Sequence, residues 1–217
     1  MKKIPTLFVR DEKNKLVTPE ITPGCEWIHS ENVIATRKYD GTCCKVKMGK
    51  LYKRYEMKYR AVSENNYKKR GWVPEKLLNE FEPSTEIFIE SFDLGKQIGW
   101  LPVGDGPEDQ WHREGFEELK KFYDYIHLDF ATADGTYELV GPKIQGNFED
   151  FDKHTLIRHG VYVVAFCPKD FEGIKKYLTV ANYEGIVWYH PDGRMTKIKK
   201  KDFGIERKHP SECSYVY

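Results

Sequence analysis

Short segments in which apolar and polar residues alternate constrain the fold of this chain most strongly. Cys43–Met48 alternates in this way and is followed by a glycine and a second segment, Leu51–Met57. Gly185–Tyr189 and Arg194–Lys199 flank the turn residues of Pro191 to Gly193, and Asp-Gly is a frequent hairpin turn. Because a period of two is typical of a half-buried strand, both pairs of segments predict antiparallel hairpins.

The rest of the chain adds helices and further strands to these hairpins. Apolar residues recur at helical spacing from Glu114 to Ile126, and a second helix is predicted from Asp170, an N-cap residue, to Leu178. Val33–Thr36 and Glu86–Phe92 are predicted strands, and residues 1–32 form an irregular lead with short strands. We therefore predict an α+β fold in a single domain over residues 1–217, with mainly antiparallel sheets and a few flanking helices.

Composition argues against a membrane or secreted protein. No apolar run approaches the ~20 residues that span a bilayer, and the first ten residues lack an apolar core of signal-peptide length. The five cysteines show no paired spacing, which argues against a disulfide framework. We expect a cytoplasmic protein without a membrane partner, and take a monomer as the default state.

Three short motifs follow one another in a fixed order: KYDG at Lys38–Gly41, EGIV at Glu184–Val187 and KIK at Lys197–Lys199. Each motif alone carries little information, because Asp-Gly is a common turn and a lysine-rich strand is usually a solvated edge. The ordered set resembles that of the covalent nucleotidyltransferases, which comprise RNA ligases, DNA ligases and mRNA capping enzymes. In these enzymes a lysine accepts a nucleoside monophosphate on its side-chain nitrogen.

The residue types of the three motifs suit this chemistry. Lys38 attacks only when deprotonated, and a free lysine has a pKa near ~10.4, which desolvation or nearby positive charge lowers. Lys197 and Lys199 supply such charge and also neutralise a reacting triphosphate. Glu184 is the candidate carboxylate for Mg²⁺, which prefers oxygen ligands. The pair Asp40–Gly41 is expected to shape the turn that presents the lysine.

The resemblance extends to one branch of this group, the 5′-to-3′ RNA ligase family first recognised in animals. It is carried by the spelling of several segments between Val33 and Phe203, namely Lys38–Cys44, Gly99–Val103 with Trp111 and His112, Tyr137–Asn147, Leu156–Gly160 and Glu184–Gly193. This resemblance implies an adenylyltransferase fold, ATP and a divalent metal (Mg²⁺ or Mn²⁺) as cofactors, and RNA with 5′-phosphate and 3′-hydroxyl ends as the substrate.

The resemblance also implies roles for single residues. Lys38 corresponds to the adenylated lysine, Glu138 to the glutamate that holds the ribose hydroxyls, and Glu184 to the glutamate at the metal. Lys197 corresponds to the first lysine of the last motif, whereas Lys199 fits the general ligase pattern, which this branch does not always keep.

Two further roles stay open between neighbouring residues. The family has a phosphate-binding arginine on the hairpin after the first motif, for which Arg54 fits best and Arg60 is the fallback. Many ligases stack an aromatic ring on adenine, and Tyr162 and Phe166 are both candidates for that ring. The alternative is that both are ordinary core residues of the apolar segment Val161–Phe166.

Positive charge gathers in two segments of a chain whose net charge is only +1. Residues 43–70 hold ten lysines and arginines against two acidic residues, and residues 194–208 hold seven against two. Because nucleic-acid backbones are attracted to such a field, we expect these segments to contribute to contacts with RNA phosphates.

Two other kinds of function are alternatives: enzymes that use the same transfer of a nucleotide to lysine, and a binding protein that catalyses no reaction. A capping-type guanylyltransferase or a DNA ligase catalytic domain would use another nucleotide or another polynucleotide. Both often continue into a separate β-barrel (OB) domain, for which the eighteen residues after Lys199 leave no room. A degenerate nucleotide- or RNA-binding protein is the alternative without catalysis, and the intact Lys38, Glu184 and Lys197 argue against it.

Overall fold

The computed structural model describes residues 4–60, 69–70, 82–83, 88–91 and 94–212, with side chains for residues 4–56 and 98–211. Contacts divide the chain into two compact units, the first formed mainly by residues 42–139 with 153–157, the second by residues up to Gly41, 140–152 and those from Arg158 onward. The prediction of a single domain stays a prediction.

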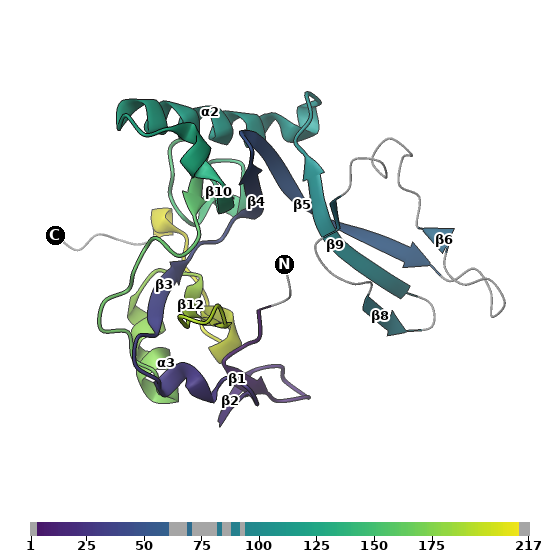
Figure 1. Cartoon of the computed structure of the whole chain (residues 1–217). Coiled ribbons are helices and arrows are strands. Elements are labelled where there is room, and N and C mark those ends of the chain that lie inside the picture. Colours follow the sequence, from purple (N-terminus) through teal and green to yellow (C-terminus); the bar gives the residue numbers. More distant parts are fainter. Residues whose placement is uncertain (1–3, 61–68, 71–81, 84–87, 92–93, 213–217) are drawn as a thin grey trace. The chain divides into compact units, whose positions relative to one another are not determined.

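The first unit is built on a mainly antiparallel sheet (Figure 1). Its central path runs in the order β11-β10-β4-β5-β9-β7, with β6 beside β5 and β8 beside β9. The strands are β4 (Thr42–Lys47), β5 (Lys50–Arg60), β6 (Lys69–Arg70), β7 (Glu82–Pro83), β8 (Phe88–Ser91), β9 (Leu94–Pro102), β10 (Gly135–Val140) and β11 (Thr155–Arg158). The predicted hairpin after the first motif is confirmed as β4 and β5. The predicted strand Glu86–Phe92 is described only at β8, and its remaining residues lie outside the described part.

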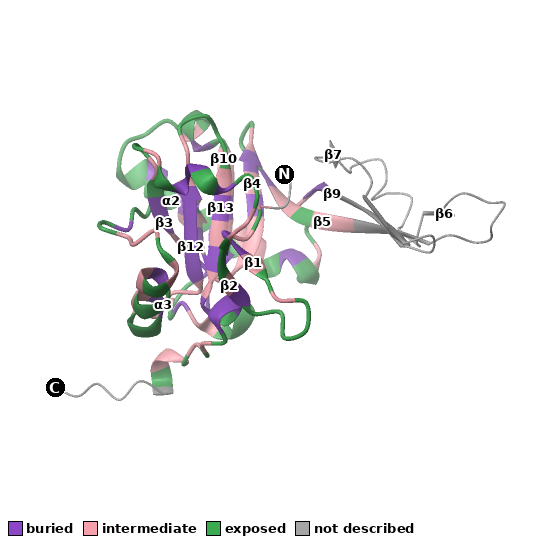
Figure 2. Ribbon diagram, turned by 90° about the horizontal axis from the view of Figure 1, so that it is seen from below, coloured by how far each residue is buried: buried purple, intermediate pink, exposed green. Residues whose placement is uncertain are grey.

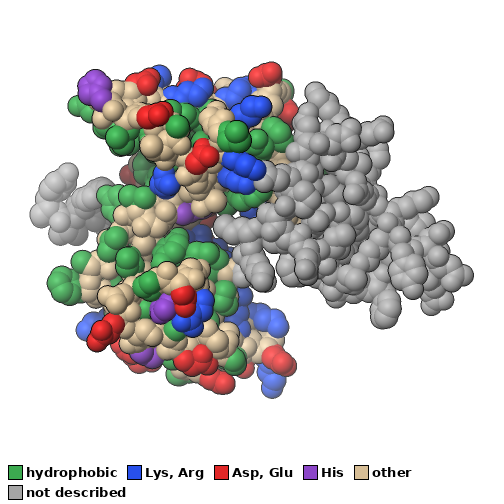
Figure 3. Space-filling model, in the orientation of Figure 1, with side chains coloured by type: hydrophobic (Ala, Val, Ile, Leu, Met, Phe, Trp, Pro, Cys, Tyr) green, Lys and Arg blue, Asp and Glu red, His purple; other side chains and the backbone are tan. Residues whose placement is uncertain are grey.

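Helix α2 (Gln110–Tyr125) covers one face of this sheet. Gly115 lets it approach closely, because a Cβ there would lie 2.6 Å from the Leu139 side chain. The buried residues Cys44, Val46, Leu51, Tyr137 and Leu139 form the core beneath the helix. Figure 3 shows acidic and basic side chains interspersed on the exposed side of α2, where Lys120 pairs with Glu117 and Lys121 with Glu118.

The helix begins four residues before its predicted start at Glu114. Its first turn follows directly on the 3-10 helix Pro107–Asp109, and Arg113 donates hydrogen bonds to the carbonyl oxygens of Gly104 and Gly106 at 2.6 and 2.8 Å. These contacts lie outside the apolar periodicity on which the prediction depended, so the sequence pattern missed them. A further 3-10 helix, Phe130–Ala133, leads into β10.

The second unit contains a three-stranded antiparallel sheet in the order β13-β12-β3. The strands are β3 (Ile34–Lys38), β12 (Gly185–Tyr189) and β13 (Met195–Lys199), so the predicted hairpin of the last two motifs is confirmed. The hairpin is closed by hydrogen bonds from the amides of His190 to the carbonyl of Arg194 and of Gly193 to that of His190, both 2.9 Å long. Figure 2 shows buried residues concentrated along β12 and the strands beside it.

Helix α3 (Phe171–Val180) packs on the core of this unit. Asp170 caps it, since the carboxylate accepts a hydrogen bond of 2.8 Å from the amide of Gly173, as its sequence position predicts. The core joins residues far apart in sequence: Leu7, Phe8, Trp27, Ile28, Ile174, Leu178, Ile186, Trp188, Ile198 and Phe203. The 3-10 helices Glu26–His29, Gln145–Asn147, Lys200–Phe203 and Pro210–Glu212 complete the unit.

The N-terminal lead is therefore part of the core. Its strands β1 (Phe8–Arg10) and β2 (Val17–Ile21) form a two-stranded sheet. Just before β1, residues 5–7 run parallel to β13, and the amide of Leu7 donates to the carbonyl of Lys197 at 2.8 Å. The amide of Lys197 donates in turn to the carbonyl of Pro5 at 3.0 Å. The first described residues thus pair with the strand that holds two of the motif lysines.

The predicted α+β class with mainly antiparallel sheets is confirmed. After Lys199 the described residues form two short 3-10 helices and no strand. Among the described residues, neither α2 nor α3 has the length and apolar character needed to cross a bilayer.

Candidate active site

The second unit brings Lys38, Glu184 and Lys199 together. In the registers of the three-stranded sheet, Gly185 on β12 lies opposite Lys38 on β3 and opposite Lys199 on β13. Glu184 therefore enters β12 between the two lysines. One of its carboxylate oxygens accepts a hydrogen bond from the Lys38 ammonium, and the other accepts one from the Lys199 ammonium.

Gly185 is the residue that allows this close arrangement. A Cβ at this position would lie 2.1 Å from the carbonyl oxygen of Ile198 and 2.9 Å from the Cα of Lys199. Since such distances are far inside van der Waals contact, only glycine fits between the strands without a shift of backbone. The glycine of the second motif is thus explained by packing against the third motif.

Glu184 is a largely buried carboxylate, with 12% of its side chain exposed. Burial by itself would raise its pKa, but the charges of Lys38 and Lys199 outweigh burial and hold the pKa of Glu184 below its ordinary value. Glu184 is therefore held between two ammonium groups, an arrangement that the sequence alone could not show.

Lys197 differs from the other two lysines of the site. It lies two residues before Lys199 on β13, so the two side chains share one face of the strand. Within the described residues, its ammonium has no hydrogen-bond or ion-pair partner. Burial, followed by the positive charges of Lys199 and Lys38, lowers the pKa of Lys197 to about 8. An anionic ligand beside Lys197 would therefore stabilise its charged form.

Asp40 and Gly41 follow Lys38 where β3 ends. The amide of Asp40 donates to the Glu149 carboxylate at 2.8 Å, and the Asp40 carboxylate lies 3.7 Å from a guanidinium nitrogen of Arg207. Burial and the nearby charge of Glu184 raise the pKa of Asp40 above its ordinary value, although Arg207 counteracts them. The turn is thus held from outside the motif, and the roles of Asp40 and Gly41 toward a nucleotide stay predictions.

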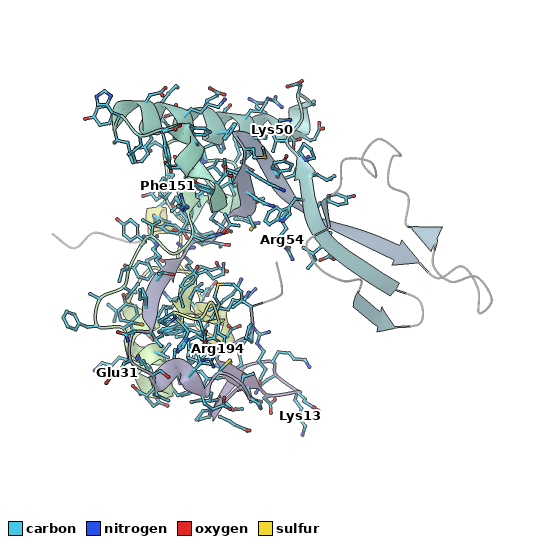
Figure 4. The ribbon with its side chains drawn as sticks, viewed as in Figure 1. Lys13, Glu31, Lys50, Arg54, Phe151 and Arg194 are labelled. Carbon is cyan, nitrogen blue, oxygen red and sulfur yellow. The ribbon has the colours of Figure 1, made fainter. Side chains whose placement is uncertain are left out.

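The first unit holds Glu138 and Arg54, so the two are placed only relative to each other. Glu138 on β10 lies opposite Cys43, and Tyr52 on β5 lies opposite Lys45. Because alternate residues of a strand share a face, Glu138 and Arg54 project from the same face of the sheet. This face is opposite to the one that packs on α2. Arg54 is exposed on β5 (Figure 4), whereas the side chain of Arg60 lies outside the described residues.

The aromatic candidates Tyr162 and Phe166 are both exposed. Residues 162–164 run beside β3, where the amide of Arg37 donates to the carbonyl of Tyr162 and the amide of Val164 donates to that of Ala35. The side chain of Tyr162 is 59% exposed, and that of Phe166 is fully exposed. The interpretation of these two rings as core residues is therefore wrong. The apolar run misled it, because this segment is irregular and Phe166 has a left-handed backbone with φ of 54°.

Of the two candidates, only Tyr162 has a described ring contact in the neighbourhood of the first motif. It meets Tyr39 edge-on at a centroid distance of 6.0 Å, and Tyr39 also meets Phe151, which Figure 4 labels, at 6.5 Å. Stacking of either ring on adenine stays a prediction.

Sequence reasoning missed three charged residues beside the first motif, Arg37, Glu149 and Arg207. The side chain of Glu149 is 1% exposed and forms an ion pair with each arginine. The Arg37 guanidinium also lies between the rings of Tyr39 and Tyr183, 4.5 Å from each centroid. No local pattern identifies such a group, because its members come from distant parts of the chain: Arg37 and Glu149 alone are 112 residues apart.

The basic segment 194–208 is less available to RNA than its composition suggests. Arg207 is almost buried, and the ammonium of Lys200 donates to the carbonyl of Ala181 at 3.0 Å. Lys199 is paired with Glu184. Arg194, Lys201 and Lys208 remain exposed.

The chemistry of Glu184 also fits the expected divalent cation. It is an ionised carboxylate, the ligand type that Mg²⁺ and Mn²⁺ take in phosphate-transfer sites. Both of its oxygens already accept hydrogen bonds from lysines. A directly bound cation would share this carboxylate with the two ammonium groups or replace one of them.

Comparison with curated proteins finds relatives that share one name. A protein named RNA ligase 1 from Pongo abelii is 26% identical over 94% of this chain and 81% of its own length. Another from Rattus norvegicus is 25% identical over 80% of this chain and 68% of its own length. One from Danio rerio is 24% identical over 94% and 81%, respectively. No model of a protein family matches the chain.

These identities are low, but they extend over most of this chain and most of each relative. The resemblance seen in the motif spellings is confirmed at this level. The chain is thus a distant relative of the proteins named RNA ligase 1.

Proposed function

We propose that this protein is an ATP-dependent RNA ligase that joins a 5′-phosphate to a 3′-hydroxyl through a covalent lysyl-AMP intermediate. The name shared by its relatives supports RNA ligation as the broad activity. The observation that carries the finer proposal is the row of Lys38, Gly185 and Lys199, with Glu184 between the two ammonium groups. A reactive lysine beside a carboxylate and further cations suits nucleotidyl transfer.

The first step transfers AMP to Lys38. After Nζ has lost a proton to water, its lone pair attacks the α-phosphorus of ATP and forms a phosphorus–nitrogen bond. The bond from the α-phosphorus to the bridging oxygen breaks, and pyrophosphate leaves with the electron pair. Glu184 holds Nζ at the end of β3 before the attack.

The next two steps move AMP to RNA and release it. An oxygen of the RNA 5′-phosphate attacks the α-phosphorus, the phosphorus–nitrogen bond breaks, and Lys38 regains its proton. The 3′-hydroxyl of the second RNA end then attacks the 5′-phosphorus, and AMP leaves as a phosphodiester forms. The hydroxyl proton passes to solvent.

Charge neutralisation falls to the lysines of β13 and to a divalent cation. Lys197, whose ammonium has no partner within the described residues, is assigned to the triphosphate and the leaving pyrophosphate. A cation at Glu184 would supply additional positive charge at the reacting phosphates. Of the residues in the first unit, Arg54 is assigned to phosphate and Glu138 to the ribose hydroxyls.

The test is incubation of the purified chain with labelled ATP or GTP and Mg²⁺, followed by denaturing electrophoresis and peptide mass spectrometry. We expect one AMP on Lys38, none in Lys38→Ala, and normal labelling of Lys175→Ala, an exposed lysine of α3. An adduct on another lysine would contradict the assignment of the nucleophile. Labelling by GTP instead of ATP would favour the guanylyltransferase alternative.

A further inference from the structure

Glu149 occupies an unusual place for a charged residue. It lies in the loop after the 3-10 helix Gln145–Asn147, and its carboxylate is almost completely buried. One oxygen accepts a hydrogen bond of 2.8 Å from the amide of Asp40, two residues after Lys38. The other accepts one from the guanidinium of Arg37, the residue before Lys38. This carboxylate therefore accepts hydrogen bonds from the chain on both sides of Lys38.

Arg207, which lies far downstream in the sequence, adds further contacts to Glu149 and Asp40. Its guanidinium lies 3.1 Å from the Glu149 carboxylate and 3.7 Å from that of Asp40. It also donates to the carbonyl oxygens of Phe148 at 2.7 Å and Asn182 at 3.2 Å, and Asn182 is two residues before Glu184. Arg207 thus joins the Glu149 loop to the segments that present Lys38 and Glu184.

The charges in this group balance. Two guanidinium groups, Arg37 and Arg207, are opposed by two carboxylates, Glu149 and Asp40. A buried charge that loses its partner is strongly unfavourable, so removal of either member forces the others to move or to admit water. The backbone that moves with them is the turn after Lys38.

We propose that Glu149, held in place by Arg207, is a positioning residue that fixes the backbone on both sides of Lys38 for attack on the nucleotide. This inference rests on the proposed adenylation of Lys38. Glu149 itself touches neither nucleotide nor RNA in this role. It acts through the amide of Asp40 and the side chain of Arg37.

A positioning role for Glu149 should affect two reactions of the protein to different extents. Formation of lysyl-AMP needs Nζ in line with the α-phosphorus, and a misplacement of about 1 Å can cost about a hundredfold in rate. Sealing of RNA that is already adenylated does not use Lys38 as a nucleophile. A loosened turn should therefore slow the first reaction much more than the second.

The experiment measures single-turnover adenylation, sealing of pre-adenylated RNA, and thermal stability for the full chain and its variants. For Glu149→Ala we expect adenylation at saturating ATP to fall about a hundredfold, with little change in the ATP concentration that gives half the maximal rate. Sealing should fall less than about threefold. Glu149→Gln keeps an acceptor for the Asp40 amide but loses the charge, so its adenylation should fall about tenfold.

Arg207 provides an independent arm. Arg207→Ala should lose adenylation, and millimolar guanidinium should restore part of it by taking the vacated place between the two carboxylates. The same guanidinium should not rescue Glu149→Ala. Glu172→Gln, which alters an exposed carboxylate on α3, is the matched control and should behave as wild type.

Three results would overturn the inference. One is adenylation at the wild-type rate by Glu149→Ala or Glu149→Gln. Another is equal loss of both reactions together with a lowered melting temperature, which would show a merely structural role. The third is failure of guanidinium to rescue Arg207→Ala. A wild-type protein that forms no adduct on Lys38 would instead refute the proposed function, and this inference with it.

Discussion

Lys197 offers a substitution whose effects on stability and on activity should be opposite. Its ammonium is half-buried beside Lys199 and Lys38, and its pKa is lowered from the ordinary 10.5 to about 8. Methionine at this position would keep an unbranched chain of similar length on β13 but remove the charge. The backbone hydrogen bonds of residue 197 with Pro5 and Leu7 would be unaffected.

The magnitude follows from the lowered pKa. A fully buried group with this pKa change would destabilise the folded state by about 3 kcal/mol at neutral pH. Because the side chain is only partly buried, solvent screening reduces this figure, and we expect about 1–2 kcal/mol. At pH 7, Lys197→Met should therefore have a free energy of unfolding about 1–2 kcal/mol above that of the wild type.

The difference between the folded-state and unfolded-state pKa of Lys197 also determines how the stability penalty changes with pH. The folded-state pKa of Lys197 lies below its unfolded-state pKa, so the folded protein binds the proton less tightly. The penalty is fully present below pH about 8 and disappears as the pH rises toward 10.5. The stability advantage of Lys197→Met should shrink over that range.

The assay is urea unfolding of wild type and Lys197→Met at several pH values from neutral pH to 10.5, with single-turnover adenylation measured on the same preparations. Loss of one charge-assisted phosphate contact, about 1.5–3 kcal/mol, should slow adenylation roughly ten- to a hundredfold. A variant that is less stable than wild type at pH 7, or a stability difference that does not change with pH, would refute the reasoning about the buried charge. Normal adenylation would refute the assignment of Lys197 to the phosphates.

Four further predictions concern the same unit. Binding of ATP to the wild type should weaken above pH about 8, where Lys197 loses its proton, whereas Lys197→Arg should keep its affinity for ATP to higher pH. Calorimetry at several pH values measures both affinities, and the same pH dependence of affinity in the two proteins would contradict the prediction. Glu184→Gln should lose most adenylation at every Mg²⁺ concentration, and a wild-type rate at any of them would exclude the metal role. Gly185→Ala should destabilise the fold by about 1–3 kcal/mol or more, because its Cβ would lie 2.1 Å from a carbonyl oxygen; Gly104→Ala, whose Cβ would meet its nearest atom at 3.6 Å, is the control in thermal unfolding. Lys38→Ala should still seal pre-adenylated RNA, and complete loss of sealing would show that Lys38 has a second role.

The parts of the fold that sequence predicted are those determined by local patterns. Alternation and Asp-Gly turns determine a hairpin within a dozen residues, so β12 and β13 were predicted correctly. A helix that begins at a capping aspartate, as α3 does, is equally local. A common site for Lys38, Glu184 and Lys199 was predicted because their three motifs, in this order, resemble those of enzymes that use all three in one site.

The parts that failed depend on burial and on distant partners. Val161–Phe166 has the composition of a core strand, but of its side chains only that of Val164 is buried, because the segment adds only irregular backbone pairing to the edge of β3. The Glu149 group joins distant residues, with Arg37 and Glu149 alone 112 positions apart, and single charged residues have no period that would reveal such pairing. Sequence patterns predict which faces are apolar, but they do not predict which charges meet.

The pairing of residues 5–7 with Lys197 has a consequence for the synthesis of the protein on the ribosome. The two segments are separated by about 190 residues, and at 5–20 residues per second the earlier one waits roughly 10–40 s for its partner. During that wait Leu7 and Phe8 lack the core residues of α3 and the 3-10 helix Lys200–Phe203 that cover them in the finished fold. A nascent chain therefore holds Lys38 without Glu184 or either lysine of β13, so it should not consume ATP before its last strand is in place.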